Sequence, residues 1–200
     1  MNVALHPAPA PSTRNILSLC AGVGGLELGI LLALDALGEA GRGICYVERE
    51  AAAASSLVAS MEAVWFHHAP VWSDMLTFDA RPWRGVVHIL ASGEPCQDNS
   101  VAGKRAGADG DRFLAPQVCR LAEECRPDLI FRENVPGNAD GQLGAIVPAL
   151  ERLGYRIERL RATGNGVDPV VAAYAFLSLR ALLAGERGAG AGVTVLTEAA

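Results

Sequence analysis

The stretch NILSLCAGVGGLELGILLALDAL, residues 15–37, contains the features that decide the fold. Its first part, Asn15–Cys20, is a short apolar run typical of a buried strand, and Ala21–Gly25 is a glycine-rich turn. Leu26–Leu37 has the apolar spacing of an amphipathic helix, and Gly38 follows it as a typical helix end. The stretch therefore predicts a strand–turn–helix unit whose turn lets the backbone approach a ligand closely.

The same alternation continues through the rest of the chain, because apolar runs predict strands and amphipathic runs predict helices. The predicted strands are 43–47, a weaker one ending at 72–74, 86–91, 128–132 and 155–161, and the predicted helices are 51–64, 113–125, 143–153 and 169–183. This order predicts an α/β fold with a doubly wound, mostly parallel sheet and helices on both faces. Ligands then bind at the carboxyl ends of the strands.

Length and composition favour one domain. The chain has 200 residues, of which 50% are hydrophobic and 20% charged, enough to bury a single core. We expect a folded domain at 15–184 and flexible ends at 1–14 and 185–200, which are rich in Ala, Gly and Pro. Since there is no apolar run of membrane-spanning length and no secretory signal pattern, we expect a cytoplasmic protein that does not contact membranes.

Cysteine usage and charge narrow the possible functions. The five cysteines have no metal-binding spacing, and their odd number does not suit a disulfide framework. We interpret them as reduced thiols and predict no metal site. The formal net charge of -5 gives no basic surface of the kind that extensive nucleic-acid contact requires.

Reactive and acidic side chains stand at the predicted strand ends. Glu48 follows the strand 43–47, where a carboxylate can accept both hydroxyls of a ribose, and Asp74 is placed to accept a hydrogen bond from an adenine amino group. Together with the glycine turn they indicate a nucleoside cofactor, although such turns are often only tight connections and this one is not GxGxxG. Cys96 is positioned as a nucleophile, although a lone cysteine is usually a buried apolar side chain.

Six segments resemble, in the correct order, the motifs of the DNA cytosine-5 methyltransferase family. The most specific are Pro95-Cys96-Gln97 and Glu133-Asn134-Val135. The segments are NILSLCAGVGGLELGI (15–30), CYVERE (45–50), WSDM (72–75), SGEPCQDNSVAGKRAGADGDR (92–112), FRENVPG (131–137) and RATGNGVDPVVAAYAF (161–176). The resemblance extends from Asn15 to about Leu183 and implies the Rossmann-like fold of S-adenosylmethionine-dependent methyltransferases.

The resemblance also implies a reaction and a set of site residues. In this family a cysteine thiolate adds to carbon 6 of a flipped cytosine, and carbon 5 then takes a methyl group from S-adenosylmethionine. Cys96 matches the nucleophile, and Glu133 matches the carboxylic acid that acts at ring nitrogen 3. The matching cofactor-binding residues are Cys20, Ala21, Gly22, Gly24, Gly25, Glu48, Asp74 and Asn165. Those for the DNA are Gln97, Ser100, Lys104, Arg105, Arg112 and Asn134.

The chain also departs from the family pattern. Cys20 stands where many members have an aromatic residue, and Asn99 replaces an apolar or aromatic one. The short segment between Asn134 and Thr163 leaves no room for the arginine-bearing QxRxR motif or for a target recognition domain. We therefore expect the chain alone to bind DNA weakly and without sequence preference, with a second chain as a possible source of target recognition.

Three functions stay open at this point. An active or minimal DNA cytosine-5 methyltransferase is favoured by Cys96 and Glu133. A catalytically silent S-adenosylmethionine-binding remnant, or a regulatory module that needs another chain for DNA recognition, is favoured by the missing segment. A different thiol-dependent pyrimidine-modifying enzyme on the same fold is the third, and no residue in the sequence distinguishes it.

Overall fold

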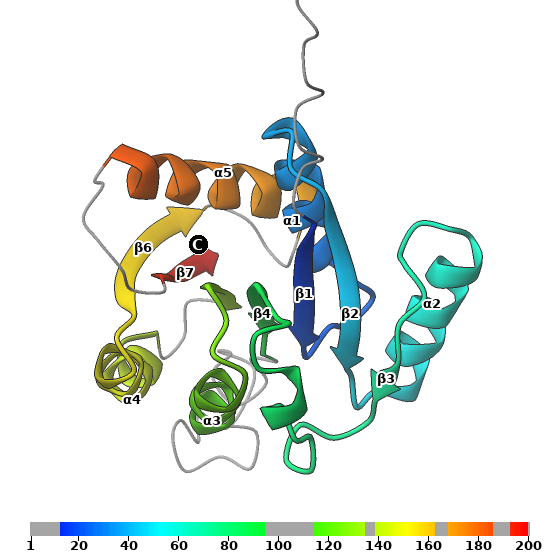
Figure 1. Ribbon diagram of the computed structural model, residues 1–200, viewed down its shortest axis with the longest axis horizontal. Coiled ribbons are helices and arrows are strands. Elements are labelled where there is room, and N and C mark those ends of the chain that lie inside the picture. Colours follow the sequence, from blue (N-terminus) through cyan, green and yellow to red (C-terminus); the bar gives the residue numbers. More distant parts are fainter. Residues whose placement is uncertain (1–12, 95–113, 135–138, 163–167, 186–192, 200) are drawn as a thin grey trace, which may run out of the picture.

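The computed structural model describes residues 13–94, 114–134, 139–162, 168–185 and 193–199, and it has a central sheet with helices on both faces (Figure 1). The strands are β1 (Arg14–Leu19), β2 (Gly41–Val47), β3 (Val71–Trp72), β4 (Ile89–Gly93), β5 (Leu129–Asn134), β6 (Arg156–Ala162) and β7 (Val193–Ala199). The helices are α1 (Gly25–Ala36), α2 (Ala51–Glu62), the 3-10 turn η1 (Arg81–Trp83), α3 (Ala115–Cys125), α4 (Ala139–Arg152) and α5 (Pro169–Gly185).

The strand order places a topological switch point in the middle of the sheet. The order is β3-β2-β1-β4-β5-β7-β6, and every strand pairing in the described part of the chain is parallel. Beyond β1 the chain winds first towards one edge and then, from β4, towards the other, so the crevice between β1 and β4 opens at their carboxyl ends. The predicted α/β fold with a doubly wound parallel sheet is confirmed.

Helices cover the sheet from both sides, which explains the nearly continuous apolar strands. In Figure 1, α1 and α5 lie on one face and α3 and α4 on the other. A parallel sheet buried on both faces needs apolar side chains at successive positions, not alternate ones. In β1, Ile16 belongs to the core on the α1 and α5 face, whereas Leu17 and Leu19 belong to the core on the α3 and α4 face.

Local hydrogen bonds define where several helices end. After α1, Gly38 has a φ of 70°, its N–H donates to the Asp35 carbonyl, and the Glu39 N–H donates to the Leu34 carbonyl, which is a Schellman motif. Two arginines bind other helix ends, where a cation also offsets the helix dipole. Arg84 donates to the carbonyls of Glu123 and Glu124 at the end of α3, and Arg126 donates to the Leu153 carbonyl beyond α4.

The C-terminal part of the chain corrects one prediction. We expected a flexible tail over 185–200, but Val193–Ala199 form β7, paired with β5 on one side and β6 on the other. The β-branched and apolar side chains of VTVLTEA favour an extended conformation, and the slot between two parallel strands satisfies the backbone hydrogen bonds on both sides. The Ala- and Gly-rich residues before β7 made the whole C-terminal segment resemble a flexible tail, so the strand pattern of VTVLTEA was not recognised in the sequence.

Smaller differences concern element boundaries. The predicted strand 86–91 begins only at Ile89, because the N–H groups of Val86 and Val87 donate to the Trp83 carbonyl in the turn after η1. The helix expected over 51–64 ends at Glu62, two residues before Val64, which has a φ of 64°. A β-branched residue is unfavourable in this left-handed region and does not continue a helix.

Removal of residues 186–200 is expected to lower the free energy of unfolding by at least about 3 kcal/mol, since two strand ladders lose their partner and each backbone hydrogen bond contributes about 1 kcal/mol. Urea unfolding followed by circular dichroism measures this. Removal of residues 2–12, which precede β1, is the matched control and should change the value by much less. Equal effects of the two truncations would contradict the placement of β7.

Candidate functional site

The register of the parallel strands brings those predicted site residues that the structure describes at the ends of β1, β2 and β5 to one edge of the sheet. Leu19 of β1 pairs with Val47 of β2 on one side and with Ser92 of β4 on the other. Gly93, the next residue of β4, pairs with Glu133 of β5. The residues at and just beyond these pairs therefore form a row along the carboxyl edge, where doubly wound sheets bind ligands.

The glycine turn between β1 and α1 requires its glycines. Gly22 and Gly24 have φ values of 55° and 92°, a region that costs other residues about 1–2 kcal/mol. The turn is closed by a hydrogen bond of 2.9 Å from the Gly24 N–H to the Ala21 carbonyl. A Cβ on Gly24 would lie 2.5 Å from the Phe66 ring, so this ring packs directly beneath the turn. Gly25 is the first residue of α1.

Cys20 follows β1 and leads into the turn with a φ of 48°, a left-handed conformation in a residue other than glycine. Its side chain is half-buried. Burial raises the pKa of the Cys20 thiol far above its usual range, and the carboxylates of Glu94 and Glu48 raise it further. Cys20 is therefore a neutral thiol beside the predicted cofactor turn.

Glu48 links the glycine turn to the end of β2. Its Oε2 accepts a hydrogen bond of 2.6 Å from the Gly22 N–H, and its Oε1 accepts one of 2.7 Å from the Glu50 N–H. Each carboxylate oxygen has two lone pairs, so both oxygens keep capacity to accept from hydroxyl groups of a ligand. The structure thus brings Glu48 and the turn together, as the sequence predicted.

Asp74 lies beyond the short edge strand β3 and has a local role. Its Oδ1 accepts a hydrogen bond of 2.9 Å from the Leu76 N–H, and its carbonyl accepts from the N–H groups of Thr77 and Phe78. These bonds build the turn that follows β3. A contact of Asp74 with an adenine stays a prediction.

Glu133 is half-buried near the end of β5, one residue before the strand ends at Asn134. Its Oε2 lies 4.0 Å from the position that a Cβ on Gly93 would take, and the Cys20 carbonyl lies 3.8 Å from that same position. The Oε1 atom is buried and has no hydrogen-bond partner among the described residues. Burial raises the pKa of Glu133, the charge of Glu94 raises it further, and Arg132 lowers it.

An ion pair that the sequence analysis missed lies next to these residues. The Arg132 Nε atom is 2.9 Å from both carboxylate oxygens of Glu94, and both side chains are only 4% exposed. Glu94 immediately follows β4, and Arg132 precedes Glu133 in β5. The sequence shows opposite charges at the ends of two predicted strands. It does not show that these strands are neighbours, so the pairing of Glu94 with Arg132 could be recognised only from the order of the strands in the sheet.

Several predicted residues lie outside the described part of the chain, namely Cys96, Gln97, Ser100, Lys104, Arg105, Arg112 and Asn165. Asn134 ends β5 in register with Glu198 of β7. The helix α5, which begins shortly after Asn165, packs against α1 so closely that a Cβ on Gly29 would lie 2.5 Å from the Ala172 Cβ. This contact joins the motif segment 15–30, which contains Gly29, to the motif segment 161–176, which contains Ala172.

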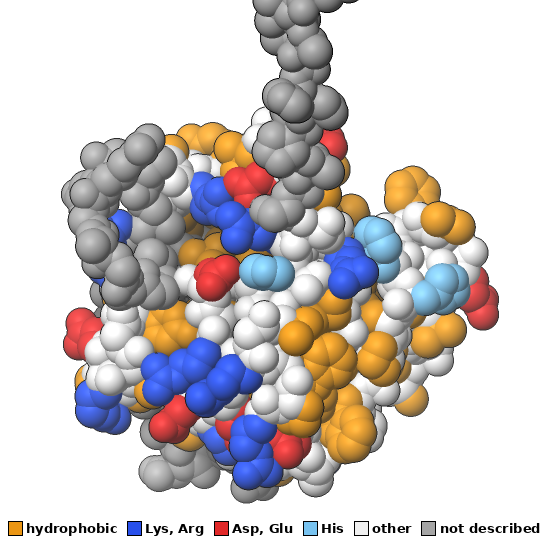
Figure 2. Space-filling view, in the orientation of Figure 1, with side chains coloured by type: hydrophobic (Ala, Val, Ile, Leu, Met, Phe, Trp, Pro, Cys, Tyr) orange, Lys and Arg blue, Asp and Glu red, His pale blue; other side chains and the backbone are white. Residues whose placement is uncertain are grey.

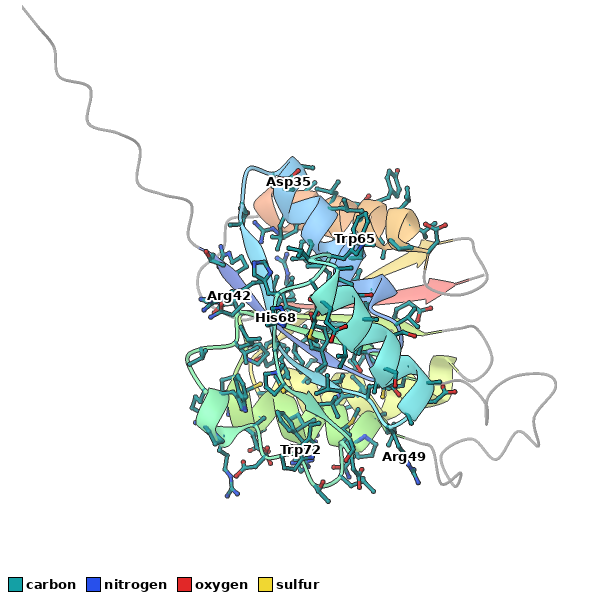
Figure 3. The ribbon with its side chains drawn as sticks, turned by 90° about the vertical axis from the view of Figure 1, so that its right-hand side faces the viewer. Asp35, Arg42, Arg49, Trp65, His68 and Trp72 are labelled. Atoms are coloured by element: carbon teal, nitrogen blue, oxygen red, sulfur yellow. The ribbon has the colours of Figure 1, made fainter. Side chains whose placement is uncertain are left out.

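A separate apolar cavity of about 330 Å³ contains none of the predicted site residues. Apolar side chains gather on the right of Figure 2, over the part of the molecule that Figure 1 labels β3. Figure 3 shows Trp65 and Trp72 on this side of the molecule, where they are 72% and 47% exposed. The cavity is lined by Cys45, Pro70, Trp72, Thr77, Phe78, Asp79 and Trp83. We assign it no role in the site at the sheet edge.

The sequence profile of the C-5 cytosine-specific DNA methylase family matches residues 14–167, more than half of the chain. The chain belongs to this family. The match extends over β1 to β6 and includes both Cys96 and Glu133. The resemblance seen in the sequence motifs is thereby confirmed.

Two methylase relatives are similar over most of this chain. Type II methyltransferase M.NgoMIV of Neisseria gonorrhoeae is 31% identical over 174 residues, which are 82% of this chain and 51% of the relative. Type II methyltransferase M.PspPI of Psychrobacter sp. (strain TA137) is 32% identical over 165 residues, 78% of this chain and 35% of the relative. The methylase chain therefore spans about half, or less, of the length of these relatives.

Among solved structures, UDP-glucuronic acid 4-epimerase from Bacillus cereus, in complex with UDP-glucuronic acid and NAD, superimposes with a TM-score of 0.51 at 8% identity. The match covers 92% of this methylase chain and 77% of the epimerase. At this identity the likeness concerns the fold alone. Within the ranges that the structure describes, no helix is long and apolar enough to cross a membrane.

Gly24→Ala is expected to lower the free energy of unfolding by about 3 kcal/mol, because the new Cβ combines left-handed strain with a collision against the Phe66 ring. Gly38→Ala is the matched control: its φ is also positive, but no atom lies within 4 Å of the new Cβ. It should cost about 1 kcal/mol. Urea denaturation of both variants measures the difference, and equal losses would contradict the close packing beneath the turn.

Proposed function

We propose that this chain is the catalytic part of a DNA cytosine-5 methyltransferase that methylates a flipped cytosine through a covalent adduct with Cys96, and that it acts in the cytoplasm. The observation that carries the proposal is the half-buried Glu133, whose pKa is raised at the edge of the sheet beside the end of β4. The segment that contains Cys96 continues from β4. An acid next to a nucleophile is the arrangement that addition to a pyrimidine ring requires.

S-adenosylmethionine fits the residues at the carboxyl ends of β1 and β2. In the turn Ala21–Gly25, no atom lies within 4 Å of the position that a Cβ on Gly22 would take, and Glu48, which accepts a hydrogen bond from the Gly22 N–H, keeps lone pairs for the ribose hydroxyls. When bound, the cofactor supplies an electrophilic methyl group. We assign its binding to the turn, to Cys20 and Glu48, and to Asp74 and Asn165 at the remaining strand and helix ends.

The proposed role of Glu133 follows from its protonation. A carboxyl group with a raised pKa stays neutral to a higher pH and can donate a hydrogen bond, here to ring nitrogen 3 of the cytosine. Such donation withdraws electron density from carbon 6 and makes it a better target for a thiolate. Asn134, at the end of the same strand, is proposed to orient the adjoining loops.

Cys96 is the proposed nucleophile, and the other cysteines support this choice. Burial raises the pKa of the Cys45 and Cys119 thiols to about 11 and that of Cys125 to about 12, and that of Cys20 still further. Because the thiolate is the attacking form, none of these four thiols suits the reaction near neutral pH. The residues proposed to contact the DNA are Gln97, Ser100, Lys104, Arg105, Arg112 and Asn134.

A second candidate is a catalytically silent S-adenosylmethionine-binding module. It is favoured by the lack of room for a target recognition domain between Asn134 and Thr163. A second chain that supplies target recognition stays a prediction under either function. Cofactor binding is common to both candidates, whereas adduct formation separates them.

Glu48→Ala is expected to weaken S-adenosylmethionine binding by about 10-fold or more, since a charge-assisted hydrogen bond contributes about 1.5–3 kcal/mol. Isothermal titration calorimetry measures the affinity of the wild type and the variant. Glu50→Gln is the matched control, because Glu50 is an exposed carboxylate two positions further along the chain. Equal affinity in all three proteins, or binding by none, would remove the cofactor assignment.

Duplex DNA of mixed sequence containing 5-fluorocytosine is expected to form a denaturation-resistant complex with the wild type in the presence of S-adenosylmethionine, because fluorine at carbon 5 blocks the final elimination. Gel electrophoresis under denaturing conditions detects the complex. Cys96→Ser should abolish it, and Cys20→Ser should retain it.

If Cys96→Ser forms the complex as readily as the wild type, another nucleophile is responsible. If the wild type binds S-adenosylmethionine but forms no complex, the silent module is the better description.

A further inference from the structure

The ion pair between Glu94 and Arg132 is unusual in its burial. Counted over backbone and side chain together, Glu94 is 5% and Arg132 3% exposed, and the Arg132 Nε atom lies 2.9 Å from both carboxylate oxygens of Glu94. Removing two charges from water costs several kcal/mol per ion, and replacing a buried pair by apolar side chains is often neutral or stabilising. The pair is therefore poorly explained by stability alone.

Its place in the sheet suggests a different role. Glu94 follows the last residue of β4, and Arg132 lies in register with Ser92. Ile130 and Phe131 belong to the cores on opposite faces of the sheet, so strand alternation puts Arg132 on the α3 and α4 face and Glu133 on the α1 and α5 face. The pair thus joins the ends of β4 and β5 directly behind Glu133.

We propose that the Glu94–Arg132 ion pair is a positioning element for Glu133: it fixes the end of β4 against β5 and holds a negative charge near Glu133, which favours the neutral, proton-donating form of that carboxyl. The inference rests on the proposed function in assigning Glu133 a proton to donate. Glu94 and Arg132 act through Glu133 and are not themselves catalytic residues.

The groups that face Glu133 are few in the described residues. Glu94 and Arg132 supply the charges, and the carbonyl of Cys20, just after β1, lies 3.8 Å from the position that a Cβ on Gly93 would take. Leu26 of α1 is apolar. On β7, Thr197 is in register with Glu133, and Glu198 pairs with the next residue, Asn134.

The two charges of the pair act on Glu133 in opposite directions. Glu94 raises the pKa of Glu133 and Arg132 lowers it, and the effect of Glu94 is the larger. Removal of Glu94 alone therefore lowers the pKa of Glu133, because the raising charge is lost while the lowering charge of Arg132 stays. Removal of both charges should give a smaller decrease.

Infrared difference spectroscopy can follow the protonated carboxyl of Glu133 in the full-length chain without DNA or cofactor. The band that disappears in Glu133→Gln belongs to Glu133, which separates it from the buried carboxyl of Glu27, whose pKa is also raised by burial. In Glu94→Gln the midpoint of this band should move to lower pH by about one unit. In Glu94→Met/Arg132→Met the midpoint should lie between that of Glu94→Gln and that of the wild type.

Glu39→Gln is the matched control, because Glu39 pairs with Arg14 and Arg180 away from the carboxyl edge. It should leave the Glu133 midpoint unchanged. The double Met variant is a second test in case Glu94→Gln misfolds, since it removes both members of the ion pair together, and thermal unfolding checks that each variant is folded. An unchanged or raised midpoint in both folded Glu94 variants would overturn the proposal.

The outcome is separable from that of the proposed function. If the midpoint shifts but no adduct forms with 5-fluorocytosine DNA, the ion pair sets the protonation of Glu133 in a silent protein. If the adduct forms and the midpoint does not shift, the methyltransferase stands and the role of the pair is refuted. If both succeed, the alkaline limb of the methylation rate against pH should move down with the midpoint in Glu94→Gln.

Discussion

The parallel register of β1 with its two neighbours is the constraint on which the rest of the structure depends. Because β1 pairs with β2 and β4 in the same direction, every helix has to cross back over a face of the sheet, and every strand delivers its last residue to the same edge. A slip of one residue would turn the side chains of a strand to the opposite face. A slip in β5 would therefore turn the Glu133 side chain away from the α1 and α5 face, on which it now lies.

Much of this edge could be predicted from sequence, because its signals are local. The glycines after β1 and the carboxylates Glu48 and Glu133 follow directly from where apolar runs stop, and the rule that ligands bind at strand carboxyl ends places them together. What could not be predicted depends on the order of the strands. The Arg132 and Glu94 contact joins residues 38 positions apart, and it required knowledge that β4 and β5 are neighbours. The strand β7 was missed for a similar reason, since a short strand becomes stable only when two others leave a slot for it.

Burial raises the pKa of both the cysteine thiols and the Glu133 carboxyl group, but the chemical consequences for the two are opposite. It raises the pKa of the four described thiols, which favours their protonated, unreactive form near neutral pH. It also raises the pKa of Glu133, and for a carboxylic acid the protonated form is the one that can donate a hydrogen bond. Desolvation thus makes the four thiols poorer nucleophiles, whereas it makes Glu133 a better hydrogen-bond donor.

The arginines that bind helix ends have a consequence for how the protein can meet a polyanion. Arg84 binds carbonyls in the last turn of α3, and Arg126 binds a carbonyl just after α4; these helix ends precede β5 and β6 and so lie towards the amino edge of the sheet. A count of basic residues therefore overstates the number of cations that are free to replace counterions on a nucleic acid backbone. Any DNA that reaches Glu133 approaches the opposite edge, so the salt dependence of binding should report on the few basic groups near that edge and not on the composition of the whole chain.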